Sequence, residues 1–103
     1  MEKRDWSKIT LIDNTNYPKK RFELHIDNKI AFIEYILAKG NTIYLTHTEV
    51  PETLKGLGIG NQIVKKALVY IREKEYKLVP ICPFIKIYIK RHPKEAEGLL
   101  KSS

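Results

Sequence analysis

The stretch that decides the fold is VPETLKGLGIGNQIVKKALVYI, residues 50–71. It opens at the end of a run of strand-forming residues and continues through Gly56, Gly58 and Gly60, three glycines at alternate positions. The apolar residues after the glycines fall on one helical stripe: Ile63, Val64, Ala67, Leu68 and Ile71. We therefore predict a strand end, a glycine-rich turn and a helix from about Gly58 to Lys74.

The glycine-rich turn predicts an anion site. Glycines let backbone N–H groups approach a ligand without a Cβ in the way, and the first turn of a helix has unpaired N–H donors and a partial positive charge. Such a pocket suits a pyrophosphate. The alternative is that the glycines serve only to turn the chain tightly. Two nucleotide motifs are excluded: Gly60 is followed by Asn61 rather than by the Lys of a P-loop, and the dinucleotide fingerprint lacks its third glycine.

The residues before the stretch predict strands. Ile9 to Ile12 is a short apolar run that stops at Asp13, and Asn16-Tyr17-Pro18 is a turn signal. A half-buried strand follows, in which the apolar residues Phe22, Leu24 and Ile26 alternate with Glu23, His25 and Asp27.

Two further strands complete the first half. Asp27-Asn28 is a tight hairpin turn, Ile30 to Ala38 is apolar on both faces as a central strand would be, and Gly40-Asn41 is the next turn. Thr42 to Val50 is rich in strand formers. Consecutive strands joined by short turns predict an antiparallel meander.

The second half predicts a crossover. Leu78 to Cys82 reads as a buried strand, which must run parallel to an earlier strand if the helix crosses over. Pro83 suits the first position of a second helix, whose one face carries Phe84, Ile87, Tyr88 and Arg91. Pro93 ends that helix, and Lys94 to Leu100 is expected to form a short final one.

Size and composition limit the class of protein. The chain has 103 residues, of which 43% are apolar, so we expect one compact domain over residues 1–103. The net charge of +7 favours anionic partners, although a solvated basic surface explains most of these charges. A single cysteine, Cys82, suits a reducing compartment. There is no membrane-spanning run, and Met1 to Trp6 lacks a secretory core, so a cytoplasmic protein without a membrane partner is expected.

The motifs together resemble a known family. Lys55-x-x-Gly58-x-Gly60 resembles the acyl-CoA signature of the GNAT acetyltransferase superfamily, Arg/Gln-x-x-Gly-x-Gly/Ala. Four segments in order resemble its small single-domain branch, from about Glu23 to Leu100: residues 46–51, 56–60, 79–84 and 88–93. The resemblance implies a mixed, mainly antiparallel α/β (α+β) sheet with flanking helices that binds acetyl-CoA.

The resemblance also implies where acetyl-CoA binds. The pantetheine arm would pair with the strand end at Glu49 and Val50. The pyrophosphate would lie on the backbone amides of Gly56, Leu57, Gly58, Ile59, Gly60 and Asn61. Lys55 stands where the family usually has Arg or Gln and keeps a cation without its planar fork. The early helices that shape an acceptor pocket are missing, so the resemblance does not carry the identity of the amine.

Transfer to an amine needs a base, donors for the oxyanion and an acid for the thiolate. Tyr88 falls where the superfamily has its general acid, or is a core aromatic. Cys82, between a strand end and a helix start, is an acid, a nucleophile or a buried structural thiol. His47 and Glu49 share a strand face and form a candidate base and its orienting group, or are ordinary strand residues.

Three functions remain open at this level. The first is an acetyl-CoA-dependent N-acetyltransferase, with Arg91 and His92 contacting the CoA phosphates or capping their helix. The second is a CoA-binding module with little or no transfer activity. The third, a nucleic-acid-binding domain, rests only on the basic charge and lacks any recognition pattern. His25 is predicted to be a surface strand residue without a role, and no metal site is predicted.

Overall fold

The structure, a computed structural model, describes residues 6–16 and 18–101. The expectations for Met1 to Asp5 and for Tyr17 fall on residues outside these ranges. The strands are β1 (Ile12–Asn14), β2 (Arg21–Ile26), β3 (Lys29–Ala38), β4 (Thr42–Glu49) and β5 (Lys77–Pro80). The helices are α1 (Ile59–Glu73) and α2 (Pro83–Arg91), and 3-10 turns lie at Trp6–Lys8, Glu52–Leu54 and Pro93–Ala96.

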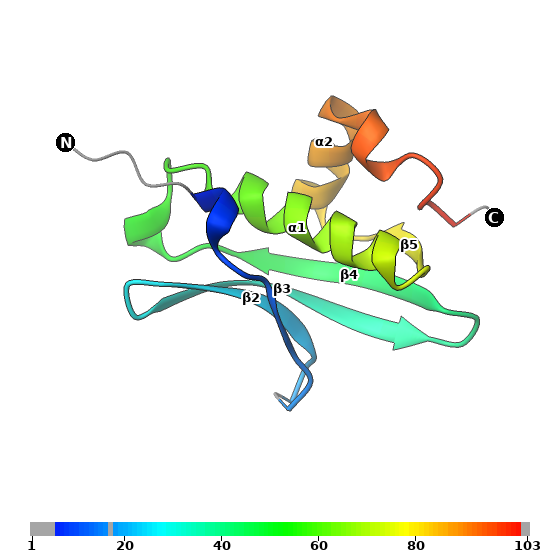
Figure 1. The fold of residues 1–103 in the computed structure, drawn as a ribbon, viewed down its shortest axis with the longest axis horizontal. Coiled ribbons are helices and arrows are strands. Elements are labelled where there is room, and N and C mark those ends of the chain that lie inside the picture. The colour runs from blue at the N-terminus through cyan, green and yellow to red at the C-terminus, as the bar shows by residue number, and fades with distance from the viewer. Residues whose placement is uncertain (1–5, 17, 102–103) are drawn as a thin grey trace.

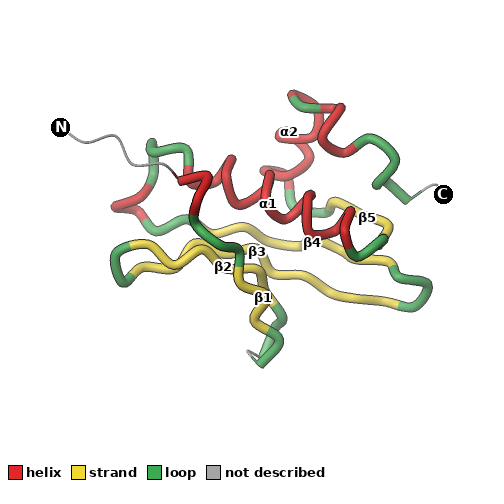
Figure 2. The backbone as a smooth tube through the Cα atoms, in the orientation of Figure 1, coloured by secondary structure: helices red, strands yellow, loops and turns green. Residues whose placement is uncertain are grey.

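The strands form one sheet in the order β1-β2-β3-β4-β5, in which only the β4–β5 pair is parallel. Helix α1 makes the crossover between β4 and β5, and both helices lie on the same face of the sheet (Figure 1). The opposite face, which we call the open face, carries no helix in the described part of the chain (Figure 2). The predicted mixed, mainly antiparallel sheet with flanking helices is therefore confirmed.

The two predicted hairpin turns are confirmed by their backbone angles. Asp27 and Asn28 have φ of 49° and 66°, and Gly40 and Asn41 have φ of 72° and 54°. Two successive residues in the left-handed region make a turn whose twist matches that of the paired strands. These short turns fix the register of β2 to β3 and of β3 to β4.

The core lies between the sheet and α1. The predicted stripe of α1 is buried, and Ile59 at the start of the helix is buried with it. The sheet supplies the other half of the core from the buried side chains Phe22, Leu24, Ile26, Ala31, Ile33, Tyr35, Ile43 and Leu45. Helix α2 begins at Pro83 as predicted, and buries Ile85 and Tyr88.

Two predicted elements were placed wrongly. The first strand is Ile12–Asn14 rather than Ile9 to Ile12. The polar residue Asp13 belongs inside it, because its carboxylate accepts hydrogen bonds from the hydroxyls of Tyr35, at 2.5 Å, and Tyr70, at 2.8 Å. These side-chain hydrogen bonds connect β1 to β3 and to α1. No local sequence pattern predicts them.

The other misplaced element is the last one. A 3-10 turn covers only Pro93–Ala96, and the chain then extends beside β5. The N–H of Leu78 donates to Leu99 at 2.7 Å, and the N–H of Lys101 donates to Leu78 at 2.9 Å. Strand β5 needs a partner on its outer edge, and the chain end supplies it in place of the predicted helix.

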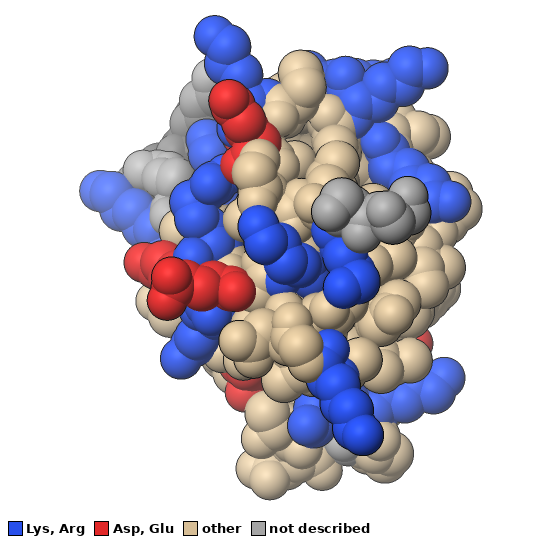
Figure 3. All heavy atoms as spheres, turned by 90° about the vertical axis from the view of Figure 1, so that its right-hand side faces the viewer, with Lys and Arg blue, Asp and Glu red and all other residues tan. Residues whose placement is uncertain are grey.

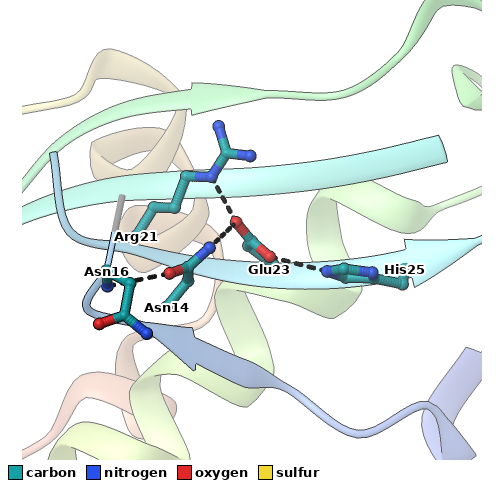
Figure 4. Close-up of polar contacts among 5 residues, drawn as sticks. All are labelled: Asn14, Asn16, Arg21, Glu23 and His25. Atoms are coloured by element: carbon teal, nitrogen blue, oxygen red, sulfur yellow. Dashed lines mark hydrogen bonds and ion pairs between the residues drawn. The ribbon is translucent and has the colours of Figure 1, made fainter. Parts of the chain in front are cut away.

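Strand β2 contains a buried carboxylate, although the alternation of apolar and polar residues predicts that it is exposed. Glu23 lies on the open face yet is only 2% exposed. Its carboxylate accepts hydrogen bonds from Arg21 and from Asn14, at 3.0 Å, and its other oxygen lies 2.7 Å from Nε2 of His25 (Figure 4). The Arg21 guanidinium also stacks 4.3 Å from the centre of the Phe32 ring. Long neighbouring side chains therefore cover a residue that a helix-free face was expected to expose.

A β-bulge changes the direction of side chains at the end of β4. Tyr35 pairs with Leu45 but Glu34 pairs with His47, so Thr46 is the extra residue. Thr48 pairs with the buried Ile33 and points to the helix side. His47, opposite Glu34, and Glu49 therefore point to the open face.

Candidate functional site

Strands β4 and β5 separate after only four paired residues. Their last pair is Leu45 with Pro80, and the carbonyl of Leu45 accepts the N–H groups of both Ile81 and Cys82 at 3.0 Å. Beyond this point β4 runs on to Glu49, whereas the other chain turns into α2. The end of β4 therefore presents an unpaired edge where the two strands diverge.

A cleft of about 440 Å³ opens at this divergence. Its lining comes from the end of β4, the glycine-rich turn, the first turn of α1 and the first turn of α2: Thr48, Glu49, Val50, Leu54, Lys55, Gly56, Gly58, Ile59, Gly60, Asn61 and Phe84. The cleft thus gathers most of the cofactor-binding residues that the sequence predicted. Leu57 is not among its lining residues, and its side chain is exposed.

The three glycines of the turn, Gly56, Gly58 and Gly60, have different structural roles. Gly56 and Gly58 have φ of 82° and 80°, a conformation that other residues adopt only with strain. Gly60 is needed for space, because a Cβ there would lie 2.8 Å from the Phe84 ring. The glycines therefore shape the turn and let α2 pack closely on α1, a role of Phe84 that the sequence analysis missed.

The first turn of α1 supplies hydrogen-bond donors to the cleft. Gly58 is the N-cap residue and offers no side chain to the N–H groups that follow. The amides of Ile59, Gly60 and Asn61 have no acceptor one turn earlier in the helix. These donors and the helix dipole favour an anion at the cleft floor.

Lys55 lies at the rim of the cleft. Its ammonium is 2.9 Å from the carboxylate of Glu52, and both side chains are exposed. That hydrogen bond raises the pKa of Lys55, so the cation is maintained. An exposed ion pair contributes little free energy, so Lys55 can leave Glu52 and bind an anion in the cleft at little cost.

Cys82 is buried just behind the divergence point. Its sulfur lies 3.4 Å from the hydroxyl of Thr48, and the residue is 5% exposed. Thr48 lines the cleft, whereas Cys82 is the N-cap of α2 and not a lining residue. Thr48 therefore lies between the thiol and the cleft, and the thiol is not open to the cleft in this structure.

His47 and Glu49 form a pair on the open face. Nε2 of His47 lies 3.0 Å from a carboxylate oxygen of Glu49, and about half of each side chain is exposed. The predicted contact between them is therefore present. Glu49 also lines the cleft, so this pair connects the cleft to the open face.

The remaining predicted residues belong to α2 and its end. The hydroxyl of Tyr88 donates to Glu95 at 2.6 Å, and the Tyr88 and His92 rings lie 4.4 Å apart. Burial, and then the bond to Glu95, raises the pKa of Tyr88 well above its ordinary value. Tyr88, Arg91 and His92 line a small cavity of about 60 Å³ together with Asn61, Phe84 and Ile87.

The small cavity continues the main cleft, since Asn61 and Phe84 border both. This explains the predicted face of α2. Phe84, Ile87, Tyr88 and Arg91 do share a face, and all four line the small cavity; Phe84 and Ile87 are 42% and 52% exposed, whereas Tyr88 is buried and also belongs to the core.

The surface carries many basic side chains. Figure 3 shows lysine and arginine side chains scattered over one whole side of the molecule, with few acidic ones among them. No helix among the described residues has the length and hydropathy needed to cross a bilayer.

Comparison with known proteins gives a consistent result. A family model described as GCN5-related N-acetyl-transferase matches residues 21–98. The chain is also similar to curated proteins called Protein NATD1: it is 34% identical to that of Xenopus tropicalis over 67 residues, 32% to that of Danio rerio over 92 and 33% to that of Homo sapiens over 67.

The extent of these matches differs. The alignment with the zebrafish protein covers 82% of each chain. The alignment with the frog protein covers 65% of this chain and 60% of the relative, and that with the human protein covers 65% and 58%.

Proposed function

The chain belongs to the GCN5-related N-acetyltransferase family, and on that premise we propose that it transfers an acetyl group from acetyl-CoA to an amine. The observation that carries the proposal is the cleft in which the unpaired end of β4 meets the first turn of α1. We further propose that residues 1–103 act as one cytoplasmic domain, in keeping with the free thiol of Cys82.

The groups that line the cleft fit CoA. Its pyrophosphate needs several N–H donors and no bulky side chain, which the amides after Gly58 and the empty space around the missing Cβ of Gly56 and Gly58 supply. Its pantetheine arm carries amides, which match the unpaired backbone at the end of β4. Lys55 at the rim, and Arg91 and His92 beyond Asn61, would hold further phosphate oxygens.

Bound acetyl-CoA would supply a thioester, and an ammonium and the thioester together give an acetamide, the CoA thiol and one released proton, as a C–N bond replaces the C–S bond. His47, supported by Glu49, would take a proton from the incoming ammonium on the open face. Cys82 would give a proton to the departing sulfur, or carry the acetyl group in a two-step transfer. Tyr88 is the other candidate acid, and it must first exchange its bond to Glu95.

A CoA-binding module without transfer activity remains the second candidate. It is favoured by one observation: in the described structure neither candidate acid is open to the cleft. Cys82 is 5% exposed, and the Tyr88 hydroxyl is already donated to Glu95.

The CoA site is tested by Gly58→Glu with Gly40→Glu as its matched control. Both glycines have positive φ, at +80° and +72°, and neither has an atom within 4 Å of an added Cβ. The two variants therefore share the strain and the added charge, and only Gly58 borders the cleft. CoA should raise the Tm of wild type and of Gly40→Glu but not of Gly58→Glu. Equal shifts in all three would reject the site.

Transfer is tested separately with acetyl-CoA and a panel of amines. Cys82→Ala and Tyr88→Phe each remove one candidate acid, and the variant that keeps CoA binding but loses thiol release identifies it. Mass spectrometry of wild type with acetyl-CoA shows whether Cys82 carries an acetyl group. CoA binding without transfer to any amine would favour the binding module.

A further inference from the structure

A second cavity, of about 470 Å³, lies outside the cleft described above. It forms where β2 ends its pairing with β3, at Arg21 opposite Glu34, and where the bulge lies. The described residues 18–20, just before β2, lie below the sheet, away from the helices (Figures 1 and 2). Its lining residues are Pro18, Lys19, Lys20, Glu34, Tyr35, Ile36, Leu37 and Thr46.

The second cavity and the cleft nearly meet at the end of β4. Thr46 lines the second cavity and Thr48 lines the cleft. Thr48 points to the helix side of the sheet, so the two spaces are connected across the open face rather than along the strand. The connection is made by His47, which lies opposite Glu34 in the ladder, and by its hydrogen-bonded partner Glu49, which lines the cleft.

The charges in the second cavity are of both signs and are not paired with each other. In the described part of the chain, the side chains of Lys19, Lys20 and Glu34 have no hydrogen bond or ion pair. The backbone carbonyl of Glu34 accepts a hydrogen bond from the Thr46 hydroxyl at 3.2 Å. Glu34 is half-buried on the His47 side, and both lysines are exposed at the outer rim. Ile36 and Leu37 add apolar surface, at 57% and 40% exposure.

We propose that this second cavity binds the acceptor, and that the acceptor is a short primary amine carrying an anionic group. This inference rests on the proposed transfer function. Glu34 holds the ammonium end beside His47, and Lys19 and Lys20 hold the anionic end. The ammonium gives up one proton to His47, and its nitrogen then faces the divergence of β4 and β5, from which the acetyl group comes. A diamine fits poorly, because its second cation would meet the lysines.

The test compares γ-aminobutyrate, n-butylamine and 1,4-diaminobutane as probes with the full chain saturated with CoA. Binding is measured by calorimetry and by amide chemical shifts, neither of which requires transfer. We expect γ-aminobutyrate to bind about tenfold more tightly than the other two and to shift the amides of residues 19–20, 34–37 and 46. Equal affinities, or shifts elsewhere, would overturn the proposal.

Variants distinguish the effect of the lysines in the second cavity on amine binding from the effect of the protein's overall charge. The double variant Lys19→Ala/Lys20→Ala should weaken γ-aminobutyrate binding about tenfold and leave n-butylamine within twofold. Lys39→Ala, an exposed lysine in the β3–β4 turn, is the control and should change neither. Glu34→Gln should weaken both amines.

The outcomes also separate this inference from the proposed function. Binding of γ-aminobutyrate at the cavity, with no transfer to any amine of the panel, supports the cavity and refutes the transferase. Transfer to n-butylamine at an equal rate, unaffected by the lysine or Glu34 variants, supports the transferase and refutes the cavity.

Discussion

Replacing Glu23 by glutamine should strongly destabilise the fold, although this residue lies on the face of the sheet that no helix covers. The side chains of Glu23 and Arg21 are 3% and 10% exposed, so they form a buried ion pair. Glutamine keeps the shape and one carbonyl acceptor but removes the charge. The guanidinium of Arg21, whose side chain is only 10% exposed, then loses the negative charge of Glu23.

The magnitude follows from that burial. Removing one partner of a buried pair costs about 3–5 kcal/mol, and the acceptor that glutamine retains reduces this to about 3 kcal/mol. The substitution also weakens the hydrogen bond between Glu23 and His25, whose side chain is half exposed. At about 4–8 °C per kcal/mol for a domain of this size, the Tm should fall by roughly 12–24 °C.

Acidification provides an independent check. Burial raises the pKa of Glu23, but the hydrogen bonds from His25, Arg21 and Asn14 outweigh burial and hold the pKa below its ordinary value. A carboxyl group whose pKa is lowered by folding stabilises the protein fully above its unfolded pKa, about 4.3, and this stabilisation is lost as the pH falls through the folded pKa. The difference between wild type and Glu23→Gln should therefore be constant near pH 7 and shrink below about pH 4.

Urea denaturation at pH 7, 5 and 3.5 measures the free energy of unfolding of both proteins. Glu52→Gln is the matched control, since Glu52 is 87% exposed in its pair with Lys55 and should cost no more than about 0.5 kcal/mol. The reasoning is refuted if Glu23→Gln costs no more than this control, or if the difference does not change with pH.

Three further results are expected. Gly60→Ala should change the free energy of unfolding by no more than about 1 kcal/mol, because the exposed Phe84 ring can move away from the new Cβ while alanine favours the helix; in a Phe84→Leu background the substitution should be stabilising in urea denaturation. Burial and the bond to Asp13 raise the pKa of Tyr70 to about 12, so stability should fall as the pH rises from 10 through 12, and Tyr70→Phe should reduce that fall in alkaline urea titrations. Cys82 should react with iodoacetamide at least about tenfold more slowly in the folded than in the unfolded chain, and equal rates would contradict its burial.

The sequence predicted the fold well where local chemistry decides it. The I′-type turn at Asp27-Asn28, the helical stripe of α1 and Pro83 at the start of α2 are each specified within a few residues. The glycine-rich turn was likewise placed correctly at a cleft, since its spacing fixes where a strand end meets a helix.

What the sequence could not predict depends on contacts between distant residues. The burial of Glu23 needs Arg21 to fold back over Phe32 on the next strand. The bond from Tyr88 to Glu95 and the closeness of Phe84 to Gly60 join different elements. The second cavity needs β2 to end beside the bulge, and neither an apolar period nor a motif marks that place.

The bulge at Thr46 has a consequence for how relatives of this chain are aligned. Strict alternation from the buried Leu45 would turn His47 and Glu49 inward, and the extra residue turns them outward instead. A relative that lacks a residue opposite Thr46 would therefore keep His47 and Glu49 on the same face, with a straighter strand. A gap opposite Thr48 would instead turn Glu49 to the helix side. Two alignments that differ only in where one gap is placed thus assign opposite faces to the same glutamate, and only the first preserves the pair with His47.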